Sequence, residues 1–154
     1  MGTPTGSIAD PFDPDGVRFL FDENLAPGVG RAFAHAGFNA RSNEDVGLKG
    51  ADDLDVIAFC GRYGAVWVTQ DIDARKRAAY ADQVRKLGVS AVFLRVPRAK
   101  QGMSTKDRFA LVARWMPWLE DRLEANRPRY FLIQTRGEPR ELAHFADQAG
   151  RRRR

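Results

Sequence analysis

The stretch Val17-Arg18-Phe19-Leu20-Phe21-Asp22-Glu23-Asn24 decides the fold of this chain. A short apolar run passes directly into two carboxylates and an amide, the pattern of a buried strand whose end reaches solvent. The stretch Ala65-Val66-Trp67-Val68-Thr69-Gln70-Asp71-Ile72-Asp73 has the same design. In a parallel sheet both strands would end at one edge, where α/β proteins bind their ligands. We therefore expect Asp22, Asp71 and Asp73 to concentrate negative charge at one place.

Strands and helices alternate along the rest of the chain. Apolar runs predict strands over 17–21, 38–41, 65–69, 90–96 and 129–135. Helical spacing of apolar residues predicts a helix after each of the first four strands, and the last of these begins near Ser104. Pro117 should kink or break that helix. The order predicts a three-layer α/β/α fold with a central, mainly parallel five-stranded sheet.

Length and composition predict one domain with a sizeable core, since 44% of the 154 residues are hydrophobic and ten are Phe. We expect residues 1–16, rich in Gly, Pro and Asp, to be disordered, a folded domain over 17–142, and a basic tail over 143–154. No apolar run approaches the roughly 20 residues of a membrane span, and the start lacks the pattern of a signal peptide. The single Cys60 is expected to be a buried structural thiol and suits a cytoplasmic protein.

The charge is polarised along the chain. Residues 1–73 hold 12 acidic and 5 basic side chains, whereas residues 74–150 hold 8 acidic and 16 basic ones, and four Arg follow. Such a division suits a metal site beside a bound polyanion. Ordinary solvated surface charge explains it equally well.

Acidic residues carry the strongest chemical signal. Asp53, in the first turn of a predicted helix, could face the same edge as the three acids that follow strands. Oxygen ligands without His or Cys beside them favour Mg²⁺ or Mn²⁺ over zinc, and a divalent ion would relieve the repulsion among crowded carboxylates. Simpler roles stay open: Asp53 could be a helix-capping acid, and Asp22 and Asp71 could be solvated turn residues.

Residues 18–24 (RFLFDEN) and 68–71 (VTQD) resemble the PIN-like ribonucleases, and within them the VapC-type toxin relatives. The resemblance spans residues 17–142. It implies a Mg²⁺- or Mn²⁺-dependent endoribonuclease that cuts single-stranded or structured RNA, with Asp22, Asp53, Asp71 and Asp73 as catalytic, metal-binding acids. It also implies a cognate antitoxin protein and, commonly, a homodimer, for which the Trp-bearing helix is a candidate interface. This sequence departs from the family pattern in two ways. The second acid is often Glu, whereas this chain has the shorter Asp53, and Asp73 follows Asp71 unusually closely.

Several other interpretations remain. Basic residues after strand ends could hold RNA phosphates; they are Arg75, Lys76, Arg77, Arg98 and Lys100. Glu23 and Asn24 could support the site or lie on the surface. A receiver domain should have a Lys after its fifth strand, where this chain has Gln134-Thr135-Arg136. Asp71-Ile72-Asp73 resembles the DxD motif of haloacid dehalogenase-type phosphohydrolases, but that motif normally ends the first strand. Both families therefore fit less well. A non-catalytic PIN-like module that binds RNA or a protein, and a nuclease acting on DNA, are the remaining alternatives.

Overall fold

The computed structural model of the protein describes residues 9–22, 25, 27–96, 103–123 and 127–146. Its strands are β1 (Arg18–Phe21), β2 (Ala40–Ser42), β3 (Ala65–Thr69), β4 (Ala91–Leu94), β5 (Tyr130–Ile133) and β6 (Arg140–Leu142). Its α-helices are α1 (Pro27–His35), α2 (Asp53–Tyr63), α3 (Ala78–Leu87) and α4 (Thr105–Arg122), with short 3₁₀ helices η2 (Glu44–Val46) and η3 (Ile72–Lys76). Among these described residues, no helix is long and apolar enough to cross a membrane.

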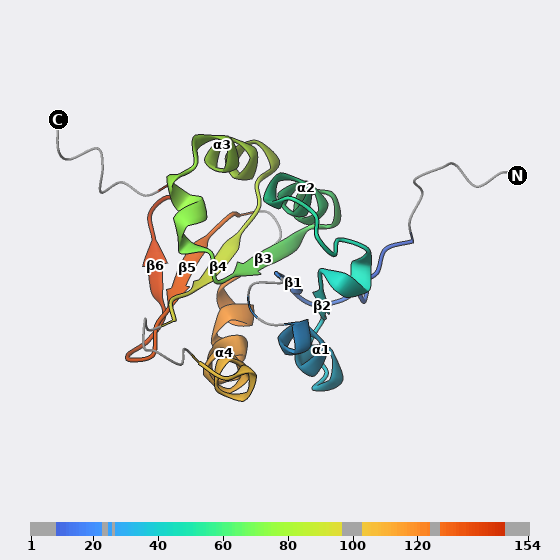
Figure 1. Ribbon diagram of the computed structural model, residues 1–154, viewed down its shortest axis with the longest axis vertical. Coiled ribbons are helices and arrows are strands. Elements are labelled where there is room, and N and C mark those ends of the chain that lie inside the picture. Colours follow the sequence, from blue (N-terminus) through green and yellow to red (C-terminus); the bar gives the residue numbers. More distant parts are fainter. Residues whose placement is uncertain (1–8, 23–24, 26, 97–102, 124–126, 147–154) are drawn as a thin grey trace, which may run out of the picture.

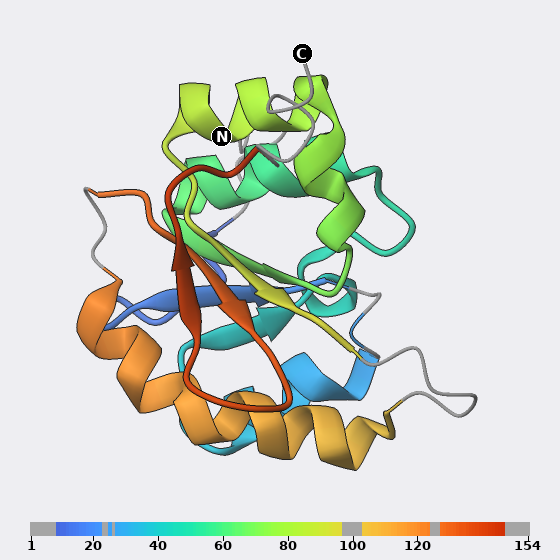
Figure 2. The same cartoon turned by 90° about the vertical axis from the view of Figure 1, so that its left-hand side faces the viewer.

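One six-stranded sheet, in the order β2-β1-β3-β4-β5-β6, forms the centre of the molecule (Figure 1). The first five strands are parallel, and β6 is antiparallel to β5. Figure 2 shows β5 and β6 side by side at one edge of the sheet. The predicted mainly parallel α/β/α fold is therefore confirmed, with a sixth strand added to the five expected.

The helices cover both faces of the sheet, with α1 and α4 on one face and α2 and α3 on the other (Figure 1). Side chains alternate along each strand, so Phe19 and Phe21 pack on the α1 and α4 face, and Leu20 packs on the α2 and α3 face. Strand β3 alternates in the same way, and its Trp67 packs in the core between the sheet and helices α2 and α3. The two cores therefore share the same strands.

Local sequence signals explain where the helices begin and end. The Asp52 side chain caps α2 by accepting a hydrogen bond from the Leu54 N–H, and Gly64 ends this helix with φ at 66°. The Ser104 side chain caps α4 in the same way. The break expected at Pro117 does not occur, because α4 continues to Arg122 with the proline inside it.

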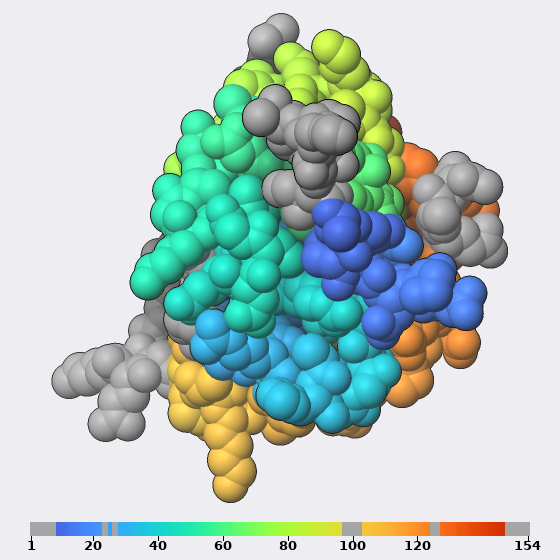
Figure 3. All heavy atoms as spheres, turned by 90° about the vertical axis from the view of Figure 1, so that its right-hand side faces the viewer, coloured from blue at the N-terminus to red at the C-terminus, as the bar shows by residue number. Residues whose placement is uncertain are grey.

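The expected N-terminal disorder is wrong for residues 9–16, because this segment is packed on the domain. Phe12 is buried and its ring lies 6.2 Å from that of Phe59. The buried Asn39 side chain hydrogen-bonds three backbone groups of the segment: the Asp13 N–H, the Asp13 carbonyl and the Asp15 carbonyl. In Figure 3 the segment, in blue, lies against the surface of the domain. Residues 1–8 lie outside the described residues.

The expected start of a basic tail at residue 143 is also too early. Phe145 is 4% exposed and packs with Trp67 and Phe93 in the core between the sheet and helices α2 and α3. Residues 140–142 form β6, a strand that the sequence did not predict. The folded domain therefore reaches at least Ala146, and Arg151 to Arg154 lie outside the described residues.

Candidate metal centre

Asp22 follows β1 and is buried at the carboxyl edge of the sheet, with 5% of its surface exposed. Its position two residues after Leu20 places it on the α2 and α3 face. Two side chains of β3 on the same face donate hydrogen bonds to its Oδ2, Thr69 Oγ1 at 3.1 Å and Trp67 Nε1 at 3.2 Å. A buried carboxylate needs such donors, and this one is held from the neighbouring strand.

Asn43 supplies a third donor from the other side of Asp22. It follows β2, whose Ser42 is paired with Phe21, and its side-chain N–H donates to Asp22 Oδ1 at 3.2 Å. The Asn43 side chain is 2% exposed, and its Oδ1 has no hydrogen-bond partner among the residues that the structure describes. Buried polar atoms are normally paired, so this oxygen is free to bind a ligand beside Asp22.

Asp53 lies in the first turn of α2, next to the capping Asp52. Its pKa is raised from 3.8 to about 6, first by burial and then by the negative charges of Asp22 and Asp71. Arg77 acts in the opposite direction. The charges that act on Asp53 come from acids on other elements, so the three carboxylates are near enough to one another to interact electrostatically.

Asp71 begins the connection after β3, and Thr69 links it to Asp22. The Thr69 hydroxyl oxygen accepts a hydrogen bond from the Asp71 N–H at 3.1 Å while its proton is donated to Asp22. The Asp71 carboxylate lies 3.9 Å from the guanidinium of Arg77, which extends from the start of α3. A cation therefore already lies beside this acid.

Asp73 is placed differently from the other three predicted acids. Its side chain is 68% exposed and forms an ion pair with Lys76 at 3.3 Å. It is not among the charges that raise the pKa of Asp53. The structure thus brings Asp22, Asp53 and Asp71 into electrostatic contact and directs Asp73 toward solvent.

The acids and Asn43 offer only oxygen ligands, which Mg²⁺ and Mn²⁺ prefer. The unpartnered Asn43 Oδ1 and the mutual repulsion of the carboxylates both fit a site built for a cation. Within the described ranges, however, no three His, Cys, Asp or Glu side chains are grouped so that they could hold one metal ion. The donor set therefore fits a hard divalent ion in its chemistry, and the acids would have to move closer together to bind it.

Sequence reasoning missed Asn43 and Trp67. A signal for Asn43 was present, because it follows β2 just as Asp22 follows β1. Trp67 precedes Thr69 by two residues and therefore shares its face of the strand. Glu23, Asn24, Arg98 and Lys100, also considered from the sequence, lie outside the described residues.

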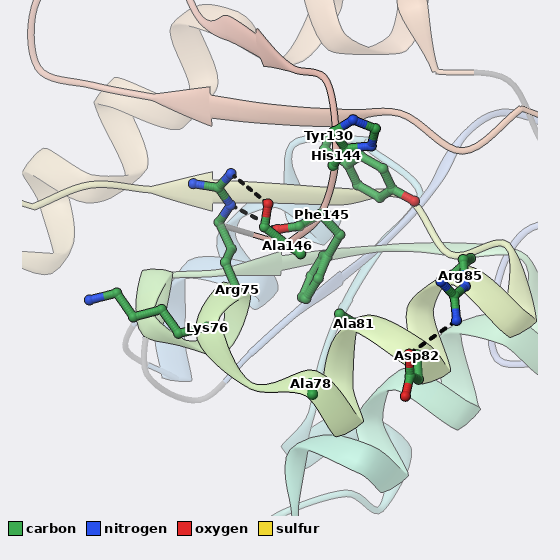
Figure 4. Close-up of a pocket in the computed structure, with 10 residues that line it drawn as sticks. All are labelled: Arg75, Lys76, Ala78, Ala81, Asp82, Arg85, Tyr130, His144, Phe145 and Ala146. Atoms are coloured by element: carbon green, nitrogen blue, oxygen red, sulfur yellow. Dashed lines mark hydrogen bonds and ion pairs between the residues drawn. The ribbon is translucent and has the colours of Figure 1, made fainter. Parts of the chain in front are cut away.

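Arg75, predicted to hold RNA phosphates, instead anchors the protein's own backbone. It lines a pocket of about 440 Å³ beside α3, and its Nε donates to the Phe145 carbonyl at 2.9 Å (Figure 4). Lys76 and Arg85 lie at opposite ends of this pocket in Figure 4, so their charges do not converge on one point. Of the basic residues after β3, Arg77 lies beside Asp71, and Lys76 pairs with the solvent-facing Asp73.

The fold and the acidic edge define an α/β domain of the kind that binds ligands outside the carboxyl ends of parallel strands. Residues 17–96 match the family described as "PIN like domain". The chain therefore belongs to the PIN-like domain family, whose members are generally nucleases. A search of curated proteins gave no match. A search of solved structures gave none either.

Proposed function

We propose that this protein is a divalent-metal-dependent endoribonuclease and the toxin of a toxin–antitoxin pair. The observation that carries the proposal is that the negative charges of Asp22 and Asp71 act on Asp53, so that acids from three different elements interact electrostatically near the carboxyl edge of the sheet. Membership of a family that is generally nuclease supports the reaction class. The division of charge along the chain supports a polyanionic substrate.

In the proposed mechanism, Asp22, Asp53 and Asp71 would hold Mg²⁺ or Mn²⁺, and Asn43 Oδ1 would be an additional ligand. When bound, the ion would make a water molecule more acidic and offset charge on the phosphodiester being cleaved. Asp73, a candidate from the sequence, is left out of this set because it pairs with Lys76. The Thr69 hydroxyl group bonds to both the Asp22 carboxylate and the Asp71 N–H, and so fixes the position of one relative to the other.

Arg77 is the proposed contact for the RNA backbone. Its side chain is 53% exposed, and its guanidinium lies 3.9 Å from Asp71. A phosphate that approaches the metal would therefore meet a cation at the rim of the site. The longer basic segment expected from the sequence, Arg75 to Arg77, is reduced to this residue and the exposed Lys76.

The decisive test is cleavage of a single-stranded RNA in Mn²⁺ by the wild-type protein and by Asp22→Asn. We expect cleavage to need the metal, to stop on chelation, and to fall on the order of 100-fold or more in the variant. Asp55→Asn, on the exposed side of the first turn of α2, is the matched control and should keep wild-type activity. Metal-independent cleavage, or full activity of Asp22→Asn, would contradict the proposal. DNA of the same sequence at identical salt separates a ribonuclease from a DNA nuclease.

The toxin assignment and its partners need separate tests. Expression should arrest bacterial growth, and Asp22→Asn should abolish the arrest. An antitoxin encoded beside the gene should relieve it when co-expressed. A homodimer, proposed to form through the Trp-bearing helix α4, would be detected by sedimentation. Growth arrest by Asp22→Asn would exclude nuclease toxicity as its cause.

A second candidate is a non-catalytic PIN-like module that binds RNA or a protein partner. The observation that favours it is that no three His, Cys, Asp or Glu side chains among the described residues are grouped so that they could hold a metal ion. Calorimetric titration with Mn²⁺ distinguishes the two. Tight binding that is lost in Asp22→Asn favours the nuclease, and RNA binding without metal binding favours the module.

A further inference from the structure

Trp67 occupies an unusual place for a core tryptophan, because its only polar atom is directed at the proposed metal centre. The side chain is 0% exposed in β3, the central strand that pairs with both β1 and β4. A buried indole N–H requires an acceptor, and here the acceptor is Asp22 Oδ2 at 3.2 Å. A phenylalanine or leucine would fill the core without making this contact.

The indole ring is fixed by residues far away in the sequence. The Phe145 ring stacks on it, with centroids 6.2 Å apart and planes 20° from parallel, and the Phe93 ring packs edge-on at 6.5 Å. Arg75 in turn holds this segment by donating to the Phe145 carbonyl and, at 3.4 Å, to the Ala146 carbonyl (Figure 4). We call Arg75, Phe145 and Ala146 the C-terminal clamp.

We propose that Trp67 is a positioning residue for the metal centre, which orients the Asp22 carboxylate through its indole N–H and is itself held by the C-terminal clamp. This inference rests on the proposed function, because it requires that Asp22 binds a metal ion. With Trp67 and Thr69 both bound to Oδ2 and Asn43 bound to Oδ1, rotation of the carboxylate would break hydrogen bonds on both of its oxygens. Removing a hydrogen-bond partner of a metal-binding carboxylate typically weakens metal affinity by about 10- to 100-fold.

The experiment uses the full chain and the three indole N–H signals that its three Trp give in a ¹⁵N–¹H NMR spectrum. Loss of one signal in Trp67→Phe assigns Trp67. On titration with Mg²⁺ we expect the Trp67 signal to shift to saturation, while those of Trp115 and Trp118 on α4 stay in place. The shift should disappear in Asp22→Asn.

Calorimetry then measures Mg²⁺ affinity directly, independently of RNA cleavage. Trp67→Phe keeps an aromatic ring in the core but removes the donor, and we expect about 10-fold weaker binding. Trp115→Phe makes the same chemical change outside the site and should bind as the wild type does. Phe145→Leu, which loosens the clamp but keeps the donor, should give a smaller loss.

Two results would overturn the inference. If Mg²⁺ binds the wild type through Asp22 but leaves the Trp67 signal unmoved, or if Trp67→Phe binds Mg²⁺ with wild-type affinity, the positioning role is wrong and the nuclease proposal survives. If the wild type binds no Mg²⁺ or Mn²⁺, both proposals fail together. Should Trp67→Phe not fold, Trp115→Phe and Trp118→Phe assign the Trp67 signal by elimination, and its Asp22-dependent shift still decides the question.

Discussion

The two faces of the sheet use the same strands for different purposes. Toward α1 and α4, the side chains of β1 and β3 are apolar to the end, from Phe19 to Phe21 and from Val66 to Val68. Toward α2 and α3, Leu20 is followed by Asp22, and Trp67 by Thr69. Only on the α2 and α3 face is a core residue followed, two positions later on the same side, by a residue of the candidate site. The comparison predicts that the first face controls stability and the second controls ligand binding.

The largest expected effect is on the apolar face. Phe33 on α1 is fully buried and stacks with Phe21 at 5.0 Å and Phe109 at 4.5 Å. Phe33→Ala should lower the free energy of unfolding by about 3–5 kcal/mol, measured by denaturant titration. Mg²⁺ affinity of the folded variant should not change. Lys106→Ala, at an exposed position of α4, is the control and should change stability by about 0.5 kcal/mol or less. A large loss of metal affinity in Phe33→Ala would contradict the prediction that the α1 and α4 face controls stability but not ligand binding.

Thr69→Val tests the other face. The variant keeps the shape of the side chain but removes both the donor to Asp22 and the acceptor for the Asp71 N–H. We expect Mg²⁺ binding to weaken roughly 10-fold, and stability to fall by about 1–3 kcal/mol because two buried groups lose their partner. Calorimetry and thermal unfolding measure the two effects. Thr105→Val, exposed in the first turn of α4, should alter neither.

Asp53→Asn should stabilise the metal-free protein. The folded-state pKa of Asp53 is about 6 against an ordinary 3.8, so the folded protein holds the extra proton through this window. The free energy of unfolding therefore falls as the pH rises from about 4 to about 6, and the penalty is fully present above about pH 6. Because solvent screens this half-buried group, we expect Asn to gain on the order of 1 kcal/mol at pH 8 and nothing below about pH 4.

Added Mn²⁺ should reverse that order, because the ion then binds the carboxylate that Asn lacks. The melting temperatures of wild type and Asp53→Asn, with and without Mn²⁺ and across pH, provide the measurement. Asp55→Asn on the same helical turn serves as the control. Equal stability of wild type and Asp53→Asn at pH 8 without metal would mean that neither burial nor the charges of Asp22 and Asp71 raise the pKa of Asp53.

The smallest effect is expected for Arg77→Ala. Loss of one exposed phosphate contact should raise the KM for RNA a few-fold and leave kcat close to that of the wild type. The slope of log affinity for RNA against log salt should decrease by about one. Lys86→Ala, an exposed cation in the last turn of α3, should leave both unchanged. A fall in kcat without a change in KM would assign Arg77 to the chemical step instead.

The parts of the fold that the sequence predicts well are those with long apolar runs. Strand β3 was predicted to the residue, because Ala65 to Thr69 are all buried and leave no alternative to a central strand. Strand β6 was missed because Arg140 and Glu141 face solvent and only Leu142 is buried. Phe12 and Phe145 were placed in tails, since an isolated aromatic residue among polar ones gives no periodic signal.

Among the site residues at strand ends, only those that follow a recognisable strand could be predicted from the sequence. Asp22 and Asp71 follow from their strands, whereas Asn43 depends on the pairing of β2 with β1, which the sequence does not state. Asp73 was grouped with Asp71 because both follow the third predicted strand. The chain enters the 3₁₀ helix η3 between them, and a turn of three residues directs positions two apart to different sides.

Both edges of the sheet are occupied by three-residue strands, β2 and β6. On β6, the exposed Glu141 accepts hydrogen bonds of 2.7 and 2.8 Å from Arg129. On β2, the Arg41 side chain donates to the Pro11 carbonyl of the N-terminal segment. Short, charged edges resist the addition of another strand. We therefore expect self-association and partner binding to use the helical surfaces, and continuous sheets between molecules to be disfavoured even at high concentration.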